Sequence, residues 1–451
     1  MKNSKTNLLK NNSLKNNSLS CIAAVAMLAF TFIFAVTASA QTETVLYSFQ
    51  GDTNNDGANP SAPLIWDASG NLYGTTYGGG YRGQCAGGCG TVFELSPNGT
   101  GGWTEAILHI FQGNKDGAYP IFGGLTFDAA GNLYGTTSAG GTSNNGTVFR
   151  LSPNGDGTWK ETILHMFTGG KDGSQPYGSV AFDKAGNLYG TTYFGGIKSC
   201  GGVGFGCGVV FKLTAQPKGL WQESILHIFT AKADGGYPYA GPVLDAAGNV
   251  YGTGAFGGST VCGGCGVVYK ISPNGSGGWS YGVLYTFLGG TDGANPEGPV
   301  ILDGTGNLYG TTNIGGGTAC NSGCGTVYEL TPEGGTWTEH QLYAFQHGTD
   351  GALPIGGVTF DSNGNLFGAT NAGGVENCSF GCGAVYKLSH NGGTWTAQGL
   401  YSFMGTTDGN TPEAGVVLDG AGNIYGTTHF GGNPNDCAGF GGCGVVYEIT
   451  P

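Results

Sequence analysis

Basic residues are scarce in this sequence. Only 10% of the 451 residues are charged, and the chain has 16 lysines and arginines against 29 acidic residues. Four of those lysines lie in the first forty residues, so the rest of the chain carries 12 basic and 29 acidic side chains, a net charge of −17. A surface of this sign repels nucleic acid and anionic membranes, and we expect neither as a partner.

Several other features are missing. The 93 glycines follow no three-residue period, which excludes a collagen-like triple helix. The motifs G-x-S-x-G, H-E-x-x-H and S-x-D-x-G-x-x-W are absent, so the common serine hydrolase, zinc protease and sialidase signatures are absent too. Beyond residue 40 no segment is apolar for long enough to span a bilayer.

The first forty residues have the pattern of a secretory signal peptide. Lysines precede an apolar run at residues 22–36, and Ala38-Ser39-Ala40 supplies the small residues of a cleavage site. We therefore predict a signal peptide over 1–40, a mature domain over 41–451 and a secreted or periplasmic protein, with an uncleaved membrane anchor as the alternative. After cleavage we expect a monomer that does not insert into the membrane.

The remaining chain contains seven copies of one repeat. Each copy carries the motif D-x-x-G-N-[LVI]-[YF]-G, and copies begin 55 to 62 residues apart. This period is too long for a β-helix and suits a propeller blade of four strands, which we call A to D. In the second copy the expected strands are 124–128, 132–138, 146–152 and 159–167. The motifs start at Asp67, Asp128, Asp183, Asp245, Asp303, Asp361 and Asp419.

The ends of the chain predict how the ring closes. Residues 44–51 match a D strand, whereas residues 444–451 match a C strand. The last copy therefore lacks its own D strand, and the N-terminus has a spare one. We predict an all-β, seven-bladed β-propeller with four strands per blade, closed by an N-terminal strand that completes the last blade.

Aromatic residues and histidines mark the D strands. His109, His165 and His227 occupy a position that is tyrosine in the other copies, so we interpret them as packing residues with a polar tip, not as metal ligands. Six tryptophans begin D strands, where we expect them to pack against neighbouring strands. They are Trp103, Trp159, Trp221, Trp279, Trp337 and Trp395.

Twelve cysteines occur as pairs in the expected B–C loops of six copies, and the second copy lacks both members. A bonded pair requires both cysteines, so we predict six local disulfides. Zinc would need four ligands where each loop offers two, and the Cys262–Cys265 spacing lacks the context of a redox motif. The predicted pairs are Cys85–Cys89, Cys200–Cys207, Cys262–Cys265, Cys320–Cys324, Cys378–Cys382 and Cys437–Cys443.

Aspartates recur before each A strand in a D-G-x-x-P segment. We interpret them as turn residues, although a ring of aspartates near a channel could also attract a cation. The segment around Asp52, Asn54 and Asp56 matches the first half of a calcium loop but has Pro63 where the final glutamate belongs. We therefore expect no cofactor, with calcium at this segment as the alternative. The seven aspartates are Asp56, Asp116, Asp172, Asp234, Asp292, Asp350 and Asp408.

Two positions per copy vary freely, and both fall on the face formed by the D–A and B–C loops. Tyr77, Tyr177, Tyr193, Tyr239 and Asn313 are the candidate ligand-binding residues there, since tyrosines can stack on sugars.

The same face holds the candidate catalytic residues. Glu413 and His429 lie at equal distances from the centre of one hairpin turn, so an antiparallel pairing makes them neighbours. A histidine beside a carboxylate suits proton transfer. Glu297 occupies the position of Glu413 two blades away, opposite Asn313. A solvated pair of side chains without a task is the alternative.

The seven motifs, the G-[TVA]-V-[FY] strands and the S-P-N-G turns resemble the choice-of-anchor tandem repeat family called GloVer, a set of secreted bacterial proteins. The motif core is also similar to that of NHL-type propellers. The resemblance covers residues 41–451 and implies export and a propeller, but no defined reaction. Members often end in an anchoring tail, and the end of this sequence at Pro451 favours free secretion.

Three hypotheses for function remain open. The first is a binding protein for a glycan, another cell-surface polymer or a cell-surface protein. The second is an extracellular enzyme, either a lyase, a lactonase or a glycoside hydrolase. The third is a structural matrix protein. Acid–base side chains converging on the channel would favour an enzyme, and an aromatic patch would favour binding.

Overall fold

The computed structural model describes residues 41–51, 55–81, 83–197, 200, 204–375, 377–437 and 441–450. The predicted signal peptide lies outside these residues. Residues 41–451 form one compact unit. The described residues contain strands, turns and three short 3-10 segments, and none of them forms a helix that could cross a membrane.

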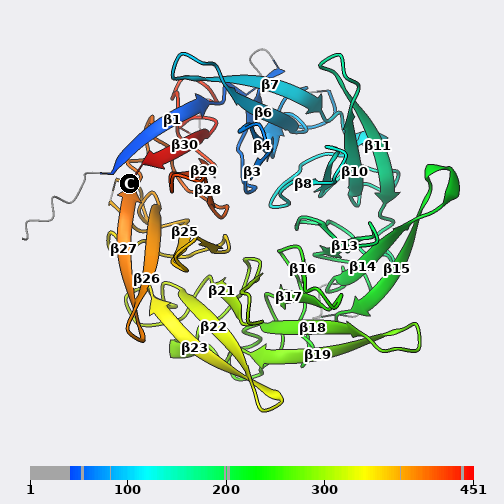
Figure 1. Cartoon of the computed structure of the whole chain (residues 1–451), viewed down its shortest axis with the longest axis vertical. Coiled ribbons are helices and arrows are strands. Elements are labelled where there is room, and N and C mark those ends of the chain that lie inside the picture. The colour runs from blue at the N-terminus through cyan, green and yellow to red at the C-terminus, as the bar shows by residue number, and fades with distance from the viewer. Residues whose placement is uncertain are drawn as a thin grey trace, which may run out of the picture. The chain divides into compact units, whose positions relative to one another are not determined.

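Seven antiparallel sheets of four strands surround a common axis, which confirms the predicted seven-bladed β-propeller (Figure 1). We number the blades I to VII in chain order of their A strands. In each blade A pairs with B, B with C, and C with D. The A strands lie nearest the axis and the D strands lie at the outside.

The two inner strands of each blade, A and B, are short. The A strands all have one length, and so do the B strands. The A strands are β3 (Ile65–Trp66), β8 (Thr126–Phe127), β12 (Ala181–Phe182), β16 (Val243–Leu244), β20 (Ile301–Leu302), β24 (Thr359–Phe360) and β28 (Val417–Leu418). The B strands are β4 (Leu72–Thr76), β9 (Leu133–Thr137), β13 (Leu188–Thr192), β17 (Val250–Gly254), β21 (Leu308–Thr312), β25 (Leu366–Thr370) and β29 (Ile424–Thr428).

The outer two strands are longer. The C strands are β6 (Thr91–Pro97), β10 (Thr147–Pro153), β14 (Val209–Ala215), β18 (Val267–Pro273), β22 (Thr326–Glu333), β26 (Ala384–Asn391) and β30 (Val445–Thr450). The D strands are β7 (Trp103–Ile110), β11 (Trp159–Met166), β15 (Trp221–Ile228), β19 (Trp279–Thr286), β23 (Thr336–Ala344), β27 (Thr394–Ser402) and, for blade VII, β1 (Thr42–Ser48). The remaining elements are β2 (Gly57–Ala58), β5 (Gly78–Gly79), η2 (Asn114–Asp116), η3 (Pro217–Gly219) and η4 (Gly290–Asp292).

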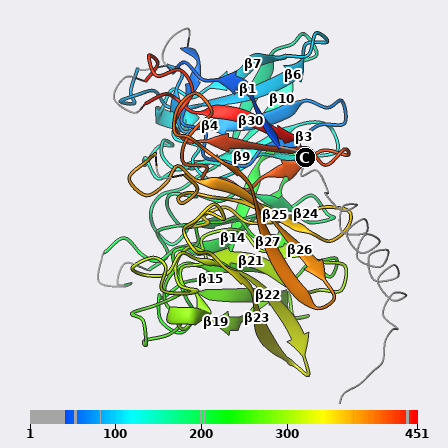
Figure 2. The ribbon, with the colours of Figure 1, turned by 90° about the vertical axis from the view of Figure 1, so that its left-hand side faces the viewer.

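Blade VII is built from both ends of the chain, as predicted. Strand β1 pairs antiparallel with β30, with Thr42 opposite Thr450 and Ser48 opposite Val445. The two strands lie side by side in both views (Figures 1 and 2). This pairing gives β30 a hydrogen-bonded neighbour on each side and leaves no open edge on the last C strand.

The A strands are shorter than predicted, and close packing at the axis explains why. The glycines that precede them face the backbone of a neighbouring blade. A Cβ atom on Gly178 would lie 2.0 Å from the backbone nitrogen of Gly241, and one on Gly356 would lie 2.4 Å from that of Gly415. Glycine is required there because two chain segments meet at the channel, where they leave the sheet before regular pairing begins.

Each D strand contains a β-bulge at the same place. In blade II, His165 lies opposite Val148 and Ile163 lies opposite Phe149, so Leu164 has no partner on β10. A bulge increases local twist and redirects the residues that follow it. The extra leucine recurs in all seven D strands, as Leu46, Leu108, Leu164, Leu226, Leu284, Leu342 and Leu400.

The aspartates of the D-G-x-x-P segments hold the turn after each D strand. Asp116 accepts the backbone N–H of Gln112 at 2.6 Å, and Asp350 accepts that of Gln346 at 2.7 Å. The histidine or tyrosine behind the bulge contacts the same carboxylate; the hydroxyl of Tyr343 donates to Asp350 at 3.0 Å. These contacts support the structural interpretation of the seven aspartates.

The core consists of layers between adjacent blades. A buried phenylalanine or tyrosine from each C strand lies beneath the glycine of the B strand, and a Cβ atom on Gly135 would lie 2.6 Å from the Phe149 ring. The tryptophans that begin the D strands pack in these layers as predicted. Trp159, for example, lies 6.5 Å from Tyr73 of the preceding blade, and Trp103 lies 6.3 Å from Trp66.

All six predicted disulfides are present, each within one B–C loop. Four of them pack against the glycine that follows a D strand, such as Gly405 beside Cys378 and Cys382, and the corresponding residue is Ala231 in blade III and His347 in blade V. In blade II, asparagines take this place: Asn144 accepts the N–H of Gly140 at 2.9 Å, and Asn145 accepts the hydroxyl of Ser174 at 2.8 Å. A hydrogen-bonded loop thus replaces the crosslinked one.

Glutamates of five D strands lie beside the turn aspartate of the preceding blade. Burial, reinforced by the neighbouring Asp56, raises the pKa of Glu105 to about 8. Burial and the adjacent aspartate raise the pKa of Glu43 and of Glu339 to about 7 in the same way. Each of these five glutamates has one buried carboxyl oxygen that makes no hydrogen bond within the described part of the chain: Glu43, Glu105, Glu161, Glu223 and Glu339.

We expect closure of blade VII to control stability. Deletion of residues 41–49 should expose the edge of β30 and cause aggregation or a large fall in melting temperature. A circular permutant that places residues 41–51 after Thr450 through a short flexible linker should restore both properties. An unchanged melting temperature for the deletion variant would contradict the pairing of β1 with β30.

We also expect the protein to lose stability as the pH rises from about 4.5 to 8. Glu43, Glu105 and Glu339 have higher pKa values in the folded than in the unfolded chain, so the folded state binds more protons in this window. A fully buried group would lower the unfolding free energy by about 1.4 kcal/mol per pH unit, and solvent screening makes the contribution of these partly exposed carboxyl groups smaller. Glu105→Gln should reduce the slope of unfolding free energy against pH, measured by urea denaturation; equal slopes would contradict this.

Candidate functional site at the channel mouth

The D–A and B–C loops share one face of the propeller, as predicted. The segment entering each A strand pairs with the start of the following B–C loop, for instance Gly57 with Gly79 and Ser174 with Phe194. Because this bridge recurs in all seven copies, the variable residues beside it are brought to the same end of the channel.

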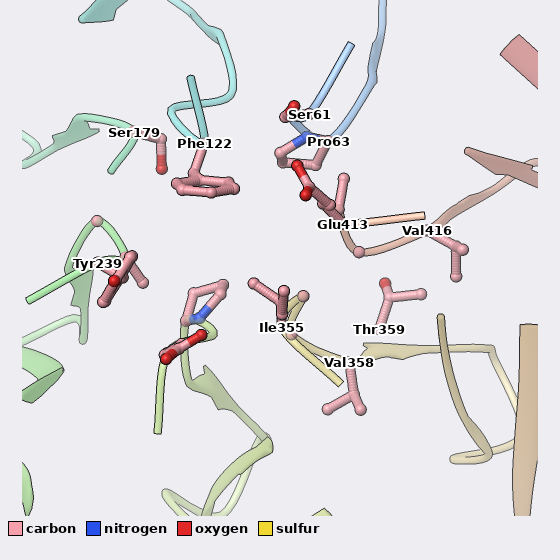
Figure 3. Close-up of a pocket in the computed structure, with 18 residues that line it drawn as sticks. Ser61, Pro63, Phe122, Ser179, Tyr239, Ile355, Val358, Thr359, Glu413 and Val416 are labelled. Atoms are coloured by element: carbon pink, nitrogen blue, oxygen red, sulfur yellow. The ribbon is translucent and has the colours of Figure 1, made fainter. Parts of the chain in front are cut away.

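A pocket of about 180 Å³ opens at this end (Figure 3). Every blade contributes to its lining. Its lining includes the side chains of Ser61, Phe122, Tyr239, Glu297, Ile355 and Glu413. The Phe122 ring and the Glu413 carboxyl group point into the same space from different sides of the axis (Figure 3).

Glu413 and His429 form an ion pair, as the hairpin symmetry predicted. The Oε2 atom of Glu413 lies 3.1 Å from Nδ1 of His429, and each side chain is 17% exposed. The buried Ser61 places its Oγ atom 2.6 Å from the same Nδ1. A hydrolase triad needs the serine on one ring nitrogen and the carboxylate on the other, so this cluster lacks that relay. It holds the imidazole in place beside the pocket.

Glu297 and Asn313 form the second predicted pair. The Asn313 amide donates to Oε2 of Glu297 at 3.1 Å. Burial raises the pKa of Glu297 to about 7, and the amide donor partly opposes that effect. The Oδ1 atom of Asn313 is buried and has no hydrogen-bond partner in the described residues. A carboxyl group with a raised pKa and an unpaired acceptor therefore lie side by side, and Glu297 lines the pocket.

Aromatic rings cover the opposite part of the mouth. Tyr177 stacks on Tyr193 with ring centres 4.8 Å apart, and Tyr193 lies 4.7 Å from Tyr239. Phe122 lies 6.0 Å from both Tyr177 and Tyr239. Burial is the main cause of a raised pKa for the hydroxyl of Tyr177, and likewise for Tyr239. Of this cluster, Phe122 and Tyr239 line the pocket directly.

Like Tyr177 and Tyr193, Tyr77 lies outside the pocket, and it lies near Tyr177. Its ring stacks on Tyr119 at 4.9 Å. The sequence prediction missed Phe122 and assigned no role to Ser61. Phe122 has a signal in the sequence: the next motif begins seven positions after the D-G-x-x-P proline in six copies, but Asp128 lies eight positions after Pro120. The extra residue moves Phe122 into the position that tyrosine holds in blades III and IV.

The calcium alternative depends on residues that are only partly described. Asp52 and Asn54 lie outside the described residues. Asp56 accepts hydrogen bonds from the N–H groups of Gln50 at 2.7 Å and Gly57 at 2.6 Å, and from Tyr47 at 3.1 Å. Both of its carboxylate oxygens accept hydrogen bonds from the protein, as a turn residue requires, and the calcium alternative stays a prediction.

The arrangement at the channel mouth combines apolar stacking surfaces with hydrogen-bonding carboxyl groups. None of the described residues that line the pocket is a lysine or arginine. The site can therefore hold a ligand with both a hydrophobic face and hydroxyl or amine groups, and it disfavours an anion.

The sequence matches the Gloeobacter/Verrucomicrobia repeat family over residues 30–204 and 199–440. These ranges cover most of the chain, and the protein belongs to this family. No curated protein matches it.

Two solved structures resemble the chain in fold. One is the calcium structure of a carbohydrate-active enzyme of family AA12 from Trichoderma reesei, with 11% identity and a TM-score of 0.42 over 92% of this chain and 96% of the other. The second is a protein of unknown function from Dyadobacter fermentans, with 13% identity and a TM-score of 0.42 over 91% and 98% of the two chains.

Proposed function

We propose that this protein is an exported propeller that binds a neutral or amine-bearing saccharide at the channel mouth. The observation that carries the proposal is one pocket with aromatic rings on one side, Phe122 and Tyr239, and carboxyl groups on the other, Glu297 and Glu413. Sugar rings present apolar C–H faces and polar edges. Aromatic rings stack on the former, and carboxyl groups accept hydrogen bonds from the latter.

The size and charge of the pocket narrow the ligand. A volume of about 180 Å³ lies below the roughly 300–1,000 Å³ of typical small-molecule pockets. It suits one terminal sugar unit, with the rest of a polymer outside. Polyanionic chains are disfavoured because the pocket holds two carboxyl groups, and the described lining residues supply no cation.

The unpaired Oδ1 of Asn313 supports the same proposal. A buried acceptor without a donor costs free energy, about 1–3 kcal/mol for an unsatisfied group. A ligand hydroxyl or ammonium group placed near Glu297 would supply the missing donor. Ligand binding would then remove the free-energy cost of the unpaired acceptor.

The second candidate function is acid–base catalysis on the same ligand. Glu297 is held as a carboxylic acid up to a pH near 7, whereas Glu413 faces an imidazole. Two carboxyl groups in different environments are what glycoside hydrolysis uses as acid and as base or nucleophile. A polyuronate lyase fits less well, since it would need positive charge to neutralise the substrate carboxylate.

The test is a glycan array with the chain expressed from residue 41. We expect binding to oligosaccharides with neutral or amino-sugar ends and none to uronic acid chains. Tyr239→Ala should weaken binding at least tenfold, whereas Tyr77→Ala, the same substitution outside the pocket, should not. Selective binding of uronic acid chains, or equal effects of both substitutions, would overturn the proposal.

The bound oligosaccharides also discriminate between the two functions. Shortened products after long incubation, abolished by Glu297→Gln while binding persists, would assign catalysis to the pocket. Intact ligands throughout would leave binding as the function.

A further inference from the structure

Three of the seven blade interfaces place a histidine beside the turn aspartate. At each interface the residue behind the D-strand bulge, the aspartate of the following turn and a residue of the next D strand meet. The histidine interfaces are I/II, II/III and III/IV, and the other four have tyrosine. The trios are His109–Asp116–Glu161, His165–Asp172–Glu223, His227–Asp234–Tyr281, Tyr285–Asp292–Glu339, Tyr343–Asp350–Ala397, Tyr401–Asp408–Glu43 and Tyr47–Asp56–Glu105.

At interface I/II three potential metal ligands converge. The Nε2 atom of His109 lies 3.3 Å from Oδ1 of Asp116 and 3.6 Å from Oε1 of Glu161. All three ligand atoms lie within 4.8 Å of one another. Ligands about 2.0–2.1 Å from a tetrahedral zinc ion are separated by roughly 3.3–3.4 Å, so the two measured spacings agree with that geometry.

The same trio recurs at interface II/III. The Nε2 atom of His165 lies 3.6 Å from Oε1 of Glu223 and 3.8 Å from Oδ2 of Asp172.

Both trios contain polar atoms that the protein leaves unpaired. Nε2 of His109 and Oε1 of Glu161 are buried and make no hydrogen bond in the described residues, and the same holds for His165 and Glu223. The histidine is close to two carboxylates but is not aligned to donate to either. Among the described residues, the same glutamate oxygen is also unpaired at three interfaces with tyrosine, so the two imidazole nitrogens are the buried polar atoms that need an explanation.

Interface III/IV shows what happens when the glutamate is absent. There Tyr281 replaces it, and its ring stacks on His227 at 3.7 Å. The Nε2 atom of His227 makes a hydrogen bond of 3.2 Å with Asp234. The unpaired imidazole nitrogen therefore occurs only where the described residues supply a histidine and a glutamate together.

We propose that His109, Asp116 and Glu161, and equally His165, Asp172 and Glu223, bind one Zn²⁺-type ion each and clamp blade II to its two neighbours. The imidazole favours zinc over calcium, which prefers oxygen ligands alone. Two carboxylates balance the charge of a divalent ion, and water can complete four-coordination. The sites lie at the outside of the ring, away from the channel mouth, and are independent of saccharide binding.

The test is a titration of the chelator-treated protein with Co²⁺, whose visible absorption reports four-coordination, followed by displacement with Zn²⁺. We expect two equivalents to bind and the melting temperature to rise. Glu161→Gln should bind one equivalent, and Glu161→Gln with Glu223→Gln should bind none. Glu105→Gln removes a glutamate from an interface with tyrosine and should retain both.

A second variant distinguishes the loss of a metal ligand from a folding defect. His109→Tyr recreates the trio found at interface VII/I, which this fold already accommodates, and it should fold while binding one equivalent. The proposal is overturned if the unmodified protein binds no more Co²⁺ than the double variant does, or if Glu105→Gln lowers the stoichiometry as much as Glu161→Gln. Equal binding of Ca²⁺ at these sites would also overturn it.

Discussion

The architecture depends on one hydrogen-bonded turn that follows the D strand. In six copies the aspartate of this turn accepts a hydrogen bond from the backbone N–H group four residues earlier. Asp408, for example, accepts the N–H of Met404 at 2.6 Å and the hydroxyl of Tyr401 at 3.0 Å. Hydrogen bonds to charged groups contribute about 1.5–3 kcal/mol each. At this point the chain leaves the outer edge of one blade and returns to the axis to begin the next. If the reversal were loose, neither the ring nor the residues at its centre would have fixed positions.

The channel mouth follows from that constraint. The proline that ends each D-G-x-x-P segment lies at a fixed distance from the turn, and the next residues face the axis. Because the turn and the glycines at the axis hold the backbone, the side chains in between are free to differ. Phe122 and Tyr239 therefore lie on one side, and Glu297 and Glu413 on another, without disturbing the blades. The repeated residues fix the backbone around the channel, and the residues that differ between copies form the candidate site.

The same turn also brings ionisable side chains together at the interfaces between adjacent blades. The bulge directs a histidine or tyrosine toward the turn aspartate, and the D strand of the following blade brings a glutamate to it. Carboxyl groups are thus concentrated at the outer rim, where Glu105 and Asp56 meet, as well as at the channel. Burial raises the pKa of all five glutamates, and the metal ion is our proposal for the two trios that also contain a histidine.

Much of the fold could be predicted from the sequence because its signals are local and repeated. Seven motifs, paired cysteines and a spare strand at residues 44–51 define the blades, the disulfides and the closure. The Glu413–His429 and Glu297–Asn313 contacts also followed from hairpin symmetry. That symmetry needs only the register of one turn.

The parts that could not be predicted depend on packing between copies. Glu161 reaches His109 because adjacent D strands lie side by side, which no spacing within a repeat reveals. Ser61 and His429 are 368 positions apart in the chain and meet through ring closure. Tyr77 faces Tyr119 and not the pocket, because the neighbouring loop supplies a ring at that point. The short A strands likewise reflect crowding at the axis.

Hydrogen exchange of individual backbone amides tests the central role of the turn most directly. The N–H groups of Gln112, Thr168, Leu288, Gln346 and Met404 bond to turn aspartates at 2.6–2.7 Å. The account predicts that these amides exchange as slowly as those of the buried B strands, although they follow the last residue of an outer strand. Exchange at the rate of an exposed loop would show that the carboxylates do not hold the turns, and would contradict the account.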